Sequence, residues 1–369
     1  MKTKVLFIAS EHSSGMIPFA AKIITVLSND ERFDVYALVV NSGNYTYKRY
    51  LSHLDAKKII QIEYPQSKIF KLIYKFYPFS ILKSIKKIVN DVKPEIIHLL
   101  TVDFSLAPYF LFHKTDNRFF FTVHDLHPHE VKSSGLFEGL LLKYIQWGNK
   151  FLYGKINNLT TSSKLQYEEL RSIYPQKRIR FTHFPSLLTQ QIINGNKQIA
   201  ELQNISNYIL FFGRVDEYKG VDLLIKAYIS SVTLQNYKLV IAGKGCSYSD
   251  LIGNNNGIIH INRFIEDSEI NDLFNKAKFV VYPYRSATMS GVLSLSYFFK
   301  KKTILSSVPF FVENKTSCST YFKTGDVDDL RSKMEMLTED QESCCKNCYE
   351  EIYSDNILIN DYNKLYSSL

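Results

Sequence analysis

The sequence predicts an α/β protein of two domains, each built on a parallel β-sheet with helices on both faces. Short apolar runs alternate with amphipathic segments through the first half, and the same alternation begins again after residue 206. The chain has 369 residues, enough for two domains of ordinary size. Because 45% of the residues are hydrophobic, each domain can bury a core.

In the first half, the apolar runs have the length of buried strands and the segments between them have helical periodicity. The predicted strands are residues 5–9, 35–40, 59–62, 96–99, 119–123 and 158–161. The predicted helices are residues 17–27, 79–89 and 136–151. Strands that alternate with helices in this way favour parallel pairing.

The second half repeats this order of elements. Its predicted strands are residues 208–212, 238–242, 258–261, 279–282 and 303–306. Its predicted helices are residues 221–229, 266–276 and 291–299. Two Rossmann-like halves in one chain imply a cleft between them.

The least regular stretch, residues 185–206, contains Pro185, Asn194, Gly195 and Asn196 and is the candidate boundary. We therefore predict an N-terminal domain over residues 1–186 and a C-terminal domain over residues 187–354. Residues 355–369 have the pattern of a terminal helix, which we expect to pack back on the N-terminal domain.

The formal net charge of +9 favours an anionic partner: a nucleic acid, a membrane face or a phosphorylated small molecule. No recognised nucleic-acid motif is present and the lysines are spread over both halves, so a nucleic-acid partner is not expected. No segment resembles a membrane span of about 20 apolar residues. The opening apolar run is too short for a signal peptide, which predicts a cytoplasmic protein.

The five cysteines are few and odd in number, which indicates reduced cytosolic thiols. Cys345 and Cys348 form a C-x-x-C pair, but no second ligand pair lies nearby, so no structural zinc is expected. No glycine fingerprint follows the first predicted strand, which counts against a nicotinamide-dependent dehydrogenase.

The most informative segment follows the first predicted strand of the second half. Gly213 ends that strand, Arg214 and Lys219 stand on each side of a short loop, and an amphipathic helix begins after Gly220. Two cations beside a helix N-terminus form an anion site, because backbone N–H groups and the helix dipole add to the side-chain charges. The simplest ligand is a phosphate or a diphosphate.

Four motifs in order resemble the C-terminal domain of GT-B glycosyltransferases of the family 4 type, and the resemblance extends over nearly the whole chain. They are the G-R-x-x-x-x-K-G loop at 213–220, Ile-Ala-Gly-Lys-Gly at 241–245, Arg-Phe-Ile at 263–265 before an acidic helix, and the stretch from Tyr282 to Leu293. The resemblance implies a GT-B fold, in which two Rossmann-like domains with parallel sheets face each other across a cleft.

The resemblance assigns roles to individual residues. It implies that Gly213, Arg214 and Lys219 hold the donor diphosphate. It places a closing turn over the donor, and the residues of that turn are Thr288, Ser290, Gly291 and Val292. It places Arg263, Phe264 and Ile265 beside the nucleobase of the donor. After the first strand, Gly15 belongs to the donor cradle and Ser13 and Ser14 to the acceptor side, although an ordinary exposed turn is the alternative interpretation of that loop.

One departure from the family pattern concerns its two glutamates, which are separated by seven residues. Their positions are occupied here by Thr288 and Ser296, which are both donor-binding candidates although neither is acidic. A subset of polysaccharide glycosyltransferases resembles this chain more closely, with a Ser-Gly-Val-Leu turn and a small residue at the second position. We interpret the change as a trait of that subset, with loss of catalysis as the alternative.

Three histidines lie within six residues, straight after the predicted strand 119–123. They are His124, His127 and His129, and Asp125 lies among them. The resemblance implies that His124 contacts the donor sugar or its phosphate; Asp125 is a candidate to orient an imidazole or accept a hydroxyl proton. His127 and His129 are candidates for the acceptor side. Although His-x-His is a metal-ligand spacing, the family works without a bound metal, so none is expected.

The resemblance implies a retaining glycosyltransferase of hexosyl or related type, without a cofactor. Its donor would be a nucleotide-diphosphate sugar and its acceptor a glycan or lipid-linked oligosaccharide of a surface polysaccharide, such as capsule, O-antigen or exopolysaccharide. His124, Asp125, Arg214 and Lys219 are the catalytic candidates. The alternatives are a non-catalytic GT-B subunit that binds nucleotide or sugar, and a sugar-nucleotide epimerase.

The segment 67–87 mixes lysines with aromatic residues. Such a stretch can lie on an anionic membrane face, which would place the protein on the inner face of the plasma membrane. A core helix with a solvated basic face is the alternative.

Overall fold

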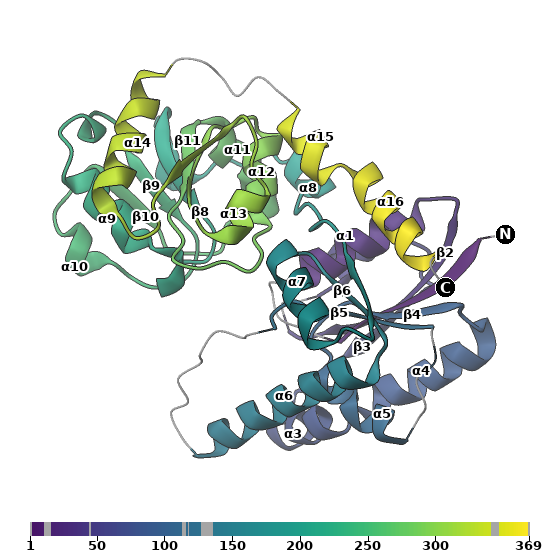
Figure 1. Cartoon of the computed structure of the whole chain (residues 1–369). Coiled ribbons are helices and arrows are strands. Elements are labelled where there is room, and N and C mark those ends of the chain that lie inside the picture. Colours follow the sequence, from purple (N-terminus) through teal and green to yellow (C-terminus); the bar gives the residue numbers. More distant parts are fainter. Residues whose placement is uncertain are drawn as a thin grey trace. The chain divides into compact units, whose positions relative to one another are not determined.

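The structure is a computed structural model that describes residues 2–10, 16–43, 46–112, 116, 118–126, 136–340 and 347–367. The chain divides into two compact units. The N-terminal unit comprises Met1–Pro185 together with Asp355–Leu369, and the C-terminal unit comprises Ser186–Ser354. Each unit is built on one sheet with helices packed against it (Figure 1).

The N-terminal unit contains a seven-stranded sheet in the order β3-β2-β1-β4-β5-β6-β7, and every neighbouring pair is parallel. Its strands are β1 (Thr3–Ala9), β2 (Phe33–Asn41), β3 (Ile59–Glu63), β4 (Ile96–Leu99), β5 (Phe119–Thr122), β6 (Asn158–Thr161) and β7 (Arg178–Phe181). Its helices are α1 (Met16–Ser28), α2 (Lys48–Leu51), α3 (Lys68–Phe76), α4 (Phe79–Val92), α5 (Ala107–Phe112), α6 (Leu136–Lys155), α7 (Lys164–Ile173) and α16 (Asp355–Tyr366), with a 3-10 turn η1 at Phe104–Leu106.

Strand β1 shows how this sheet is buried on both faces. Because successive side chains of a strand point to opposite faces, Phe7 packs in one core with residues of α1 and α16, and Leu6 and Ile8 pack in the other with residues of α4 and α6. All three side chains are buried. Strands with two buried faces read as continuous apolar runs, which explains why β1 is visible in the sequence.

Helix α16 returns to the N-terminal unit through polar contacts as well as packing. Tyr366 Oη lies 2.8 Å from His98 Nδ1, and the other ring nitrogen of His98 lies 2.9 Å from Thr122 Oγ1. At the start of the helix Asp355 pairs with Lys22 of α1 at 2.7 Å. In Figure 1, α16 accordingly lies beside α1.

His98 predicts a pH dependence of stability. Complete burial lowers the pKa of His98 to about 3, whereas in the unfolded chain it titrates near its ordinary value of about 6.5. Below about pH 6.5 His98 therefore binds a proton in the unfolded state but stays neutral in the folded state. The free energy of unfolding falls as the pH falls. When the pH is lowered from about 7.5 to about 5.5, His98 alone should lower the free energy of unfolding by about 1.4 kcal/mol.

Urea unfolding at the two pH values measures this loss. His98→Phe, which removes the titrating group, should show a pH-dependent loss smaller than that of the wild type by that amount. His53→Phe, at an exposed histidine, is the control and should behave as the wild type does. Equal pH dependence in the wild type and His98→Phe would contradict the prediction.

The C-terminal unit contains a six-stranded sheet in the order β10-β9-β8-β11-β12-β13, again with parallel pairs. Its strands are β8 (Tyr208–Phe212), β9 (Leu239–Ala242), β10 (Ile258–Ile261), β11 (Ala277–Tyr282), β12 (Thr303–Ser306) and β13 (Ser319–Phe322). Its helices are α8 (Gln190–Ile193), α9 (Val221–Ile229), α10 (Ser249–Ile252), α11 (Asp267–Asn275), α12 (Val292–Phe298), α13 (Pro309–Glu313), α14 (Val327–Glu339) and α15 (Cys348–Tyr353), with 3-10 turns η2 (Ala200–Leu202), η3 (Glu217–Lys219) and η4 (Leu234–Asn236).

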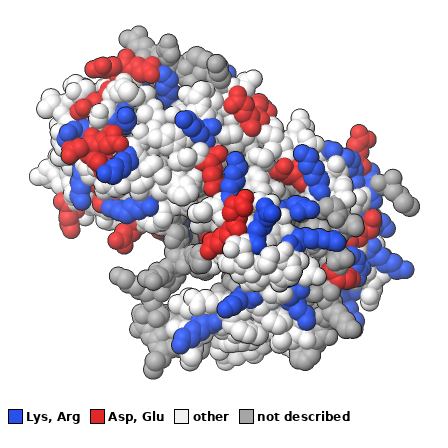
Figure 2. Space-filling view, in the orientation of Figure 1, with Lys and Arg blue, Asp and Glu red and all other residues white. Residues whose placement is uncertain are grey.

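The two parallel α/β sheets confirm the predicted fold class. Each predicted strand and helix corresponds to an element of the structure, with ends that differ by a few residues. The sequence analysis did not predict the edge strands β7 and β13 or several helices, of which α7 and α14 are the longest. On the face shown in Figure 2, Lys and Arg side chains occur over both units and are interspersed with Asp and Glu.

Candidate functional site

The predicted anion loop lies at the carboxyl ends of β8 and β11. These two strands are neighbours in the sheet, although the strands β9 and β10 separate them along the chain. The strand order reverses between them, and ligands of open α/β sheets bind at such a switch point, beyond the carboxyl ends of the strands. The loop after β8, the glycine turn after β9 and the segment after β11 meet there.

Two glycines allow these loops to approach one another. Gly220 has a φ of +65°, and a Cβ on it would lie 2.0 Å from the carbonyl oxygen of Pro283. Gly243 has a φ of +147°, and a Cβ there would lie 1.9 Å from the carbonyl oxygen of Gly213. Any other residue would force these backbones apart, so glycine is required at both positions.

Lys219 is the central residue of the site. It ends the 3-10 turn η3, is only 8% exposed, and its Nζ donates a hydrogen bond to Tyr284 Oη at 2.9 Å. The same ammonium lies 4.5 Å from the centre of the Tyr284 ring and 5.5 Å from that of Tyr218. Among the residues that the structure describes, none forms an ion pair with Lys219; Asp216 pairs with Arg214 instead.

The surroundings of Lys219 keep it charged. Burial opposes the ammonium form, but Tyr284 and Tyr218 outweigh that effect, and the pKa of Lys219 is raised above its ordinary value. A buried cation with only phenol and ring partners is costly unless an anion completes its coordination. The site is therefore prepared for a negatively charged ligand.

Arg214 differs from Lys219 in exposure. Its side chain is 70% exposed, and its guanidinium pairs with Asp216 at 2.9 Å. Such exposed pairs contribute little to stability and exchange readily with another anion. Arg214 is thus available at the rim of the site, while Lys219 lies at its base.

Arg285 fixes the loop that carries Lys219, and the sequence analysis did not identify it. Its guanidinium donates to both carboxylate oxygens of Asp222 at 2.8 and 2.7 Å, and to the carbonyl of Glu217 at 2.9 Å. Its backbone N–H donates to the carbonyl of Tyr218. The segment after β11 therefore holds both η3 and the first turn of α9.

The predicted closing turn lies beside Lys219 through Tyr284. Ser290 is buried, and its hydroxyl lies 3.5 Å from Tyr284 Oη. Gly291 precedes α12, and Val292 is the first residue of that helix. Thr288 is half-buried. Lys219, Tyr284 and Ser290 thus form one polar cluster. Tyr284 has no residue-specific signal in the sequence beyond its place in the Tyr-Pro-Tyr stretch.

Ser296 is not accessible to a ligand in this structure. It is fully buried on α12, and its hydroxyl lies 2.9 Å from Tyr282 Oη, which is also fully buried. Tyr282 Oη further donates to the carbonyl of Val292 at 3.3 Å. Sequence reasoning placed Ser296 among the donor-binding residues, whereas the structure places its hydroxyl in the core beneath the site.

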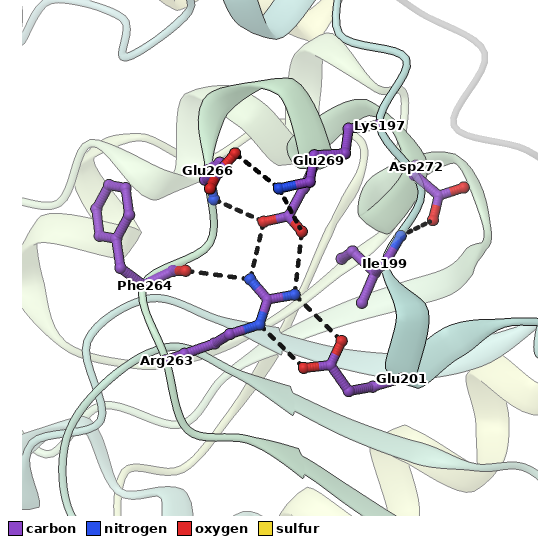
Figure 3. Close-up of polar contacts among 8 residues, drawn as sticks. All are labelled: Lys197, Ile199, Glu201, Arg263, Phe264, Glu266, Glu269 and Asp272. Carbon is purple, nitrogen blue, oxygen red and sulfur yellow. Dashed lines mark hydrogen bonds and ion pairs between the residues drawn. The ribbon is translucent and has the colours of Figure 1, made fainter.

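Arg263 makes ion pairs within the protein (Figure 3). Its guanidinium bridges Glu201 at 2.9 Å and Glu269 at 2.8 Å, and donates to the carbonyl of Phe264. The pKa of Arg263 is raised by these two carboxylates. Glu269 in turn closes the capping box of α11 with Glu266. Of the three residues predicted to border a nucleobase, Ile265 is buried and only Phe264 presents a largely exposed side chain.

In the N-terminal unit His124 follows β5 and is 4% exposed. Its Nε2 lies 2.7 Å from the carbonyl oxygen of Leu100, so Nε2 carries the proton and Nδ1 is the acceptor. Nδ1 is buried and has no hydrogen-bond partner among the described residues. Burial lowers the pKa of His124, although the Leu100 carbonyl and Asp125 oppose that effect, so the ring is neutral near pH 7.

Gln166 holds the turn that follows His124. Its side-chain amide donates to the carbonyl of His124 at 2.8 Å, and its oxygen accepts the N–H of Leu126 at 2.6 Å. Asp125 lies between them and is half-buried. Near the end of β1, buried Asp103 accepts the backbone N–H of Ser10 at 2.9 Å. Asp103 therefore ties the segment after β4 to the end of β1.

Five predicted site residues lie outside the described residues: Ser13, Ser14, Gly15, His127 and His129. Within the described part of the chain, no three His, Cys, Asp or Glu side chains are grouped so that they could hold a metal ion. In the same part of the chain, none of the helices combines the length and apolar character that crossing a membrane requires.

Comparison with known proteins agrees with this geometry. Residues 206–340, most of the C-terminal unit, match the family described as "Glycosyl transferases group 1". No curated protein sequence matches the chain.

Among solved structures, the chain is similar over its full length to HepE from Anabaena, determined in complex with UDP and glucose, with 13% identity, 100% of both chains covered and a TM-score of 0.68. It is similar to WaaB, a lipopolysaccharide outer core galactosyltransferase, with 15% identity, 100% of both chains covered and a TM-score of 0.62. UDP-GlcNAc 2-epimerase from Methanocaldococcus jannaschii also resembles it, with 11% identity, 99% of this chain and 100% of that chain covered and a TM-score of 0.59.

At these identities the solved structures establish the fold alone, and the family match is confined to the C-terminal unit. The expected resemblance is confirmed: the chain has the GT-B fold, and its C-terminal unit, which carries the Lys219 site, matches the family of glycosyl transferases group 1 over residues 206–340.

Proposed function

We propose that the protein is a retaining glycosyltransferase that moves a sugar from a nucleotide-diphosphate sugar to a glycan or lipid-linked acceptor during synthesis of a surface polysaccharide. The observation that carries the proposal is the buried ammonium of Lys219, which lies at the switch point of the C-terminal sheet without a carboxylate partner among the described residues. HepE, which has the same fold, was solved with UDP and with UDP-glucose, and this supports a donor of that class.

The chemistry requires the leaving nucleotide diphosphate to depart as the sugar becomes cation-like. Lys219 would neutralise charge on the diphosphate from the base of the site, and Arg214 would do so from the rim after exchanging Asp216 for phosphate. Preorganised charge of this kind typically contributes about 100- to 1,000-fold per donor group. Ser290 would donate a hydrogen bond from its hydroxyl to the same ligand.

Phe264 is the residue we propose to contact the nucleobase, since the neighbouring Arg263 is held by two glutamates and Ile265 is buried. In the N-terminal unit, His124 offers a neutral ring whose free Nδ1 can accept a hydroxyl proton. Neither role involves a metal or an organic cofactor.

A second candidate function is a GT-B subunit that binds a nucleotide or sugar without catalysis. It is favoured by one observation: the two positions of the family's glutamates are Thr288 and a buried Ser296, so no carboxylate is available from either. The intact Lys219 cluster is required for binding under both hypotheses and does not separate them.

A thermal-shift panel of nucleotides and nucleotide sugars tests binding. A ligand that binds the folded state raises the melting temperature by mass action, so one plate reports the base and the sugar together. A nucleotide-diphosphate sugar should stabilise the wild type. If no nucleotide or nucleotide sugar shifts the transition, the proposal fails.

The ligand identified in this way then serves to test catalysis. Slow hydrolysis of the donor by the purified protein indicates a transferase. Binding without hydrolysis, and without transfer to an oligosaccharide acceptor mixture, indicates the non-catalytic subunit. Conversion of the free donor to its epimer would instead assign the epimerase reaction of the same fold.

A further inference from the structure

We propose that helix α3, with the adjoining ends of α4 and α6, is a docking surface for an anionic lipid bilayer. The proposal rests on the side chains of the N-terminal unit alone and does not require the donor site. One consequence of the proposal rests on the proposed function: a glycosyltransferase held on the bilayer would reach an acceptor that is carried on a lipid.

The apolar side chains of α3 face outward. Ile69 is 70% exposed and Phe70 is 62% exposed, and of the nine residues of the helix only Tyr74 is buried. Phe79, at the start of α4, is 67% exposed. In an amphipathic helix that only completes a core, the apolar face is the buried one. Helix α3 departs from that rule over its whole length.

Helix α6 extends the exposed area. The ring of Phe76 lies 4.6 Å from that of Tyr144, and Tyr144 stacks on Trp147 at 5.7 Å. Trp147 is 44% exposed. Figure 1 shows α3 and α6 side by side. We name this area the α3–α6 surface and define it by Ile69, Phe70, Ile73, Phe76, Phe79 and Trp147. An apolar area of this kind marks an interaction site on a folded protein.

Lysines accompany the α3–α6 surface. Between residues 64 and 90 the chain has six lysines and no Asp or Glu. Lys68 is exposed at the start of α3, and Lys83 and Lys86 are exposed on α4, whose residues Ile81, Leu82, Ile85 and Ile88 are buried in the core. Aromatic and aliphatic side chains that enter the headgroup region, flanked by lysines, are the combination that binds an anionic membrane face.

The charge also decides against a second copy of the chain as the occupant. Two α3–α6 surfaces placed face to face would bring together the segments 64–90 of both copies, each with six lysines and no Asp or Glu. Anionic lipid headgroups provide the opposite charge, and acyl chains provide an apolar phase for the exposed rings.

The experiment is sedimentation of the purified full chain with vesicles of phosphatidylcholine alone and of phosphatidylcholine mixed with phosphatidylglycerol, in the absence of donor. The wild type should bind the mixed vesicles and bind less as salt is raised. Lys68→Gln/Lys83→Gln/Lys86→Gln should bind them about 100-fold more weakly, since each lysine near such a surface contributes about fivefold. Ile69→Ser/Phe70→Ser/Phe79→Ser should lose at least about tenfold.

Matched controls come from the other unit. Val232→Ser/Val312→Ser/Met336→Ser removes three exposed apolar side chains, and Lys315→Gln/Lys323→Gln removes two exposed lysines. Both should bind as the wild type does, and circular dichroism should show every variant folded. Indifference of the wild type to phosphatidylglycerol, or equal binding by the α3–α6 variants and the controls, would overturn the proposal.

Light scattering after size exclusion, without lipid, tests whether a second copy of the chain occupies the surface. A dimer that the α3 variant abolishes, together with no vesicle binding, would assign the surface to self-association and contradict the lipid proposal. Because donor binding is measured separately by thermal shift, failure of the lipid test leaves the proposed function standing, and the reverse also holds.

Discussion

The Lys219→Met variant is expected to turn over the donor about 100-fold more slowly than the wild type, with the fold intact. Lys219 is the buried cation of the site, and its ammonium is held by Tyr284 rather than by a carboxylate. Methionine keeps most of the volume of the side chain and removes the charge together with the hydrogen bond to Tyr284 Oη. Lys219→Ala should lose more than tenfold in turnover for the same reason.

The stability of this variant is part of the prediction. Because Lys219 has no ion-pair partner among the described residues, its removal leaves no buried carboxylate unpaired, and replacing a buried charge by an apolar group is often neutral or stabilising. Urea unfolding should therefore show a free energy of unfolding equal to or above that of the wild type. A fall in turnover without loss of stability separates a functional role from a structural one.

The matched control is Lys226→Met. Lys226 lies on the next helix, α9, and forms a 3.6 Å pair with Asp222 at the surface. Its loss should change neither turnover nor stability by more than the small value of an exposed pair. Wild-type turnover in Lys219→Met would contradict the assignment of the anion site, and so would an equal loss in both variants.

The sequence predicted the fold because its strands are buried on both faces. The runs that became β1 and β8 are continuous and apolar, since helices cover both sides of each sheet. Strands β7 and β13 lie at sheet edges, where one side has no neighbour. Strand β7 accordingly alternates exposed arginines with a buried isoleucine over four residues, too short and polar a pattern to distinguish from a turn.

The candidate site was predicted in part. The glycines and the lysine of the 213–220 loop could be recognised from the local sequence, because a turn with positive φ needs glycine and an anion site needs a cation close to the helix. The partner of that lysine could not be recognised in this way. Tyr284 lies 65 residues away, and it reaches Lys219 because β8 pairs with β11. For the same reason the sequence could not show that Arg263 pairs with Glu201, 62 residues away.

Ser296 shows the opposite case, in which the motif position was known but its environment was not. The spacing of the family's glutamates, with seven residues between them, fixes a position in the sequence, but the burial of that position depends on what the facing strand contributes. Here that residue is Tyr282, whose hydroxyl reaches Ser296 at 2.9 Å. A tyrosine and a serine together occupy the space beneath the site.

Restoring the family's carboxylate at this position should therefore damage the protein. In Ser296→Glu the side chain enters a fully buried position beside Tyr282. Burial favours the neutral form and raises the pKa of such a carboxyl to about 7, which corresponds to roughly 3.5 kcal/mol of lost stability at neutral pH. Turnover should fall with the folded fraction, and donor affinity should not increase.

The pH dependence distinguishes charge from size as the cause. A glutamate whose folded pKa is raised lowers stability once the pH exceeds about 4.3, because the unfolded chain then ionises while the folded one stays protonated, and the loss is complete above the raised pKa. The loss relative to the wild type should shrink as pH falls toward about 4.3, the ordinary value for glutamate. Urea unfolding of both proteins at several pH values measures this difference. A purely steric cost would be independent of pH.

Ser296→Ala and Ser296→Gln are the comparison variants. Alanine removes one hydrogen bond, and Tyr282 Oη keeps its bond to the Val292 carbonyl, so the expected loss is about 1 kcal/mol with donor binding unchanged. Glutamine has the size of glutamate without its charge and should show the pH-independent part of the loss. If Ser296→Glu instead keeps wild-type stability and binds donor more tightly, its carboxylate reaches the ligand. The buried placement of residue 296 would then be wrong, and the donor-binding role predicted from the motif would be right.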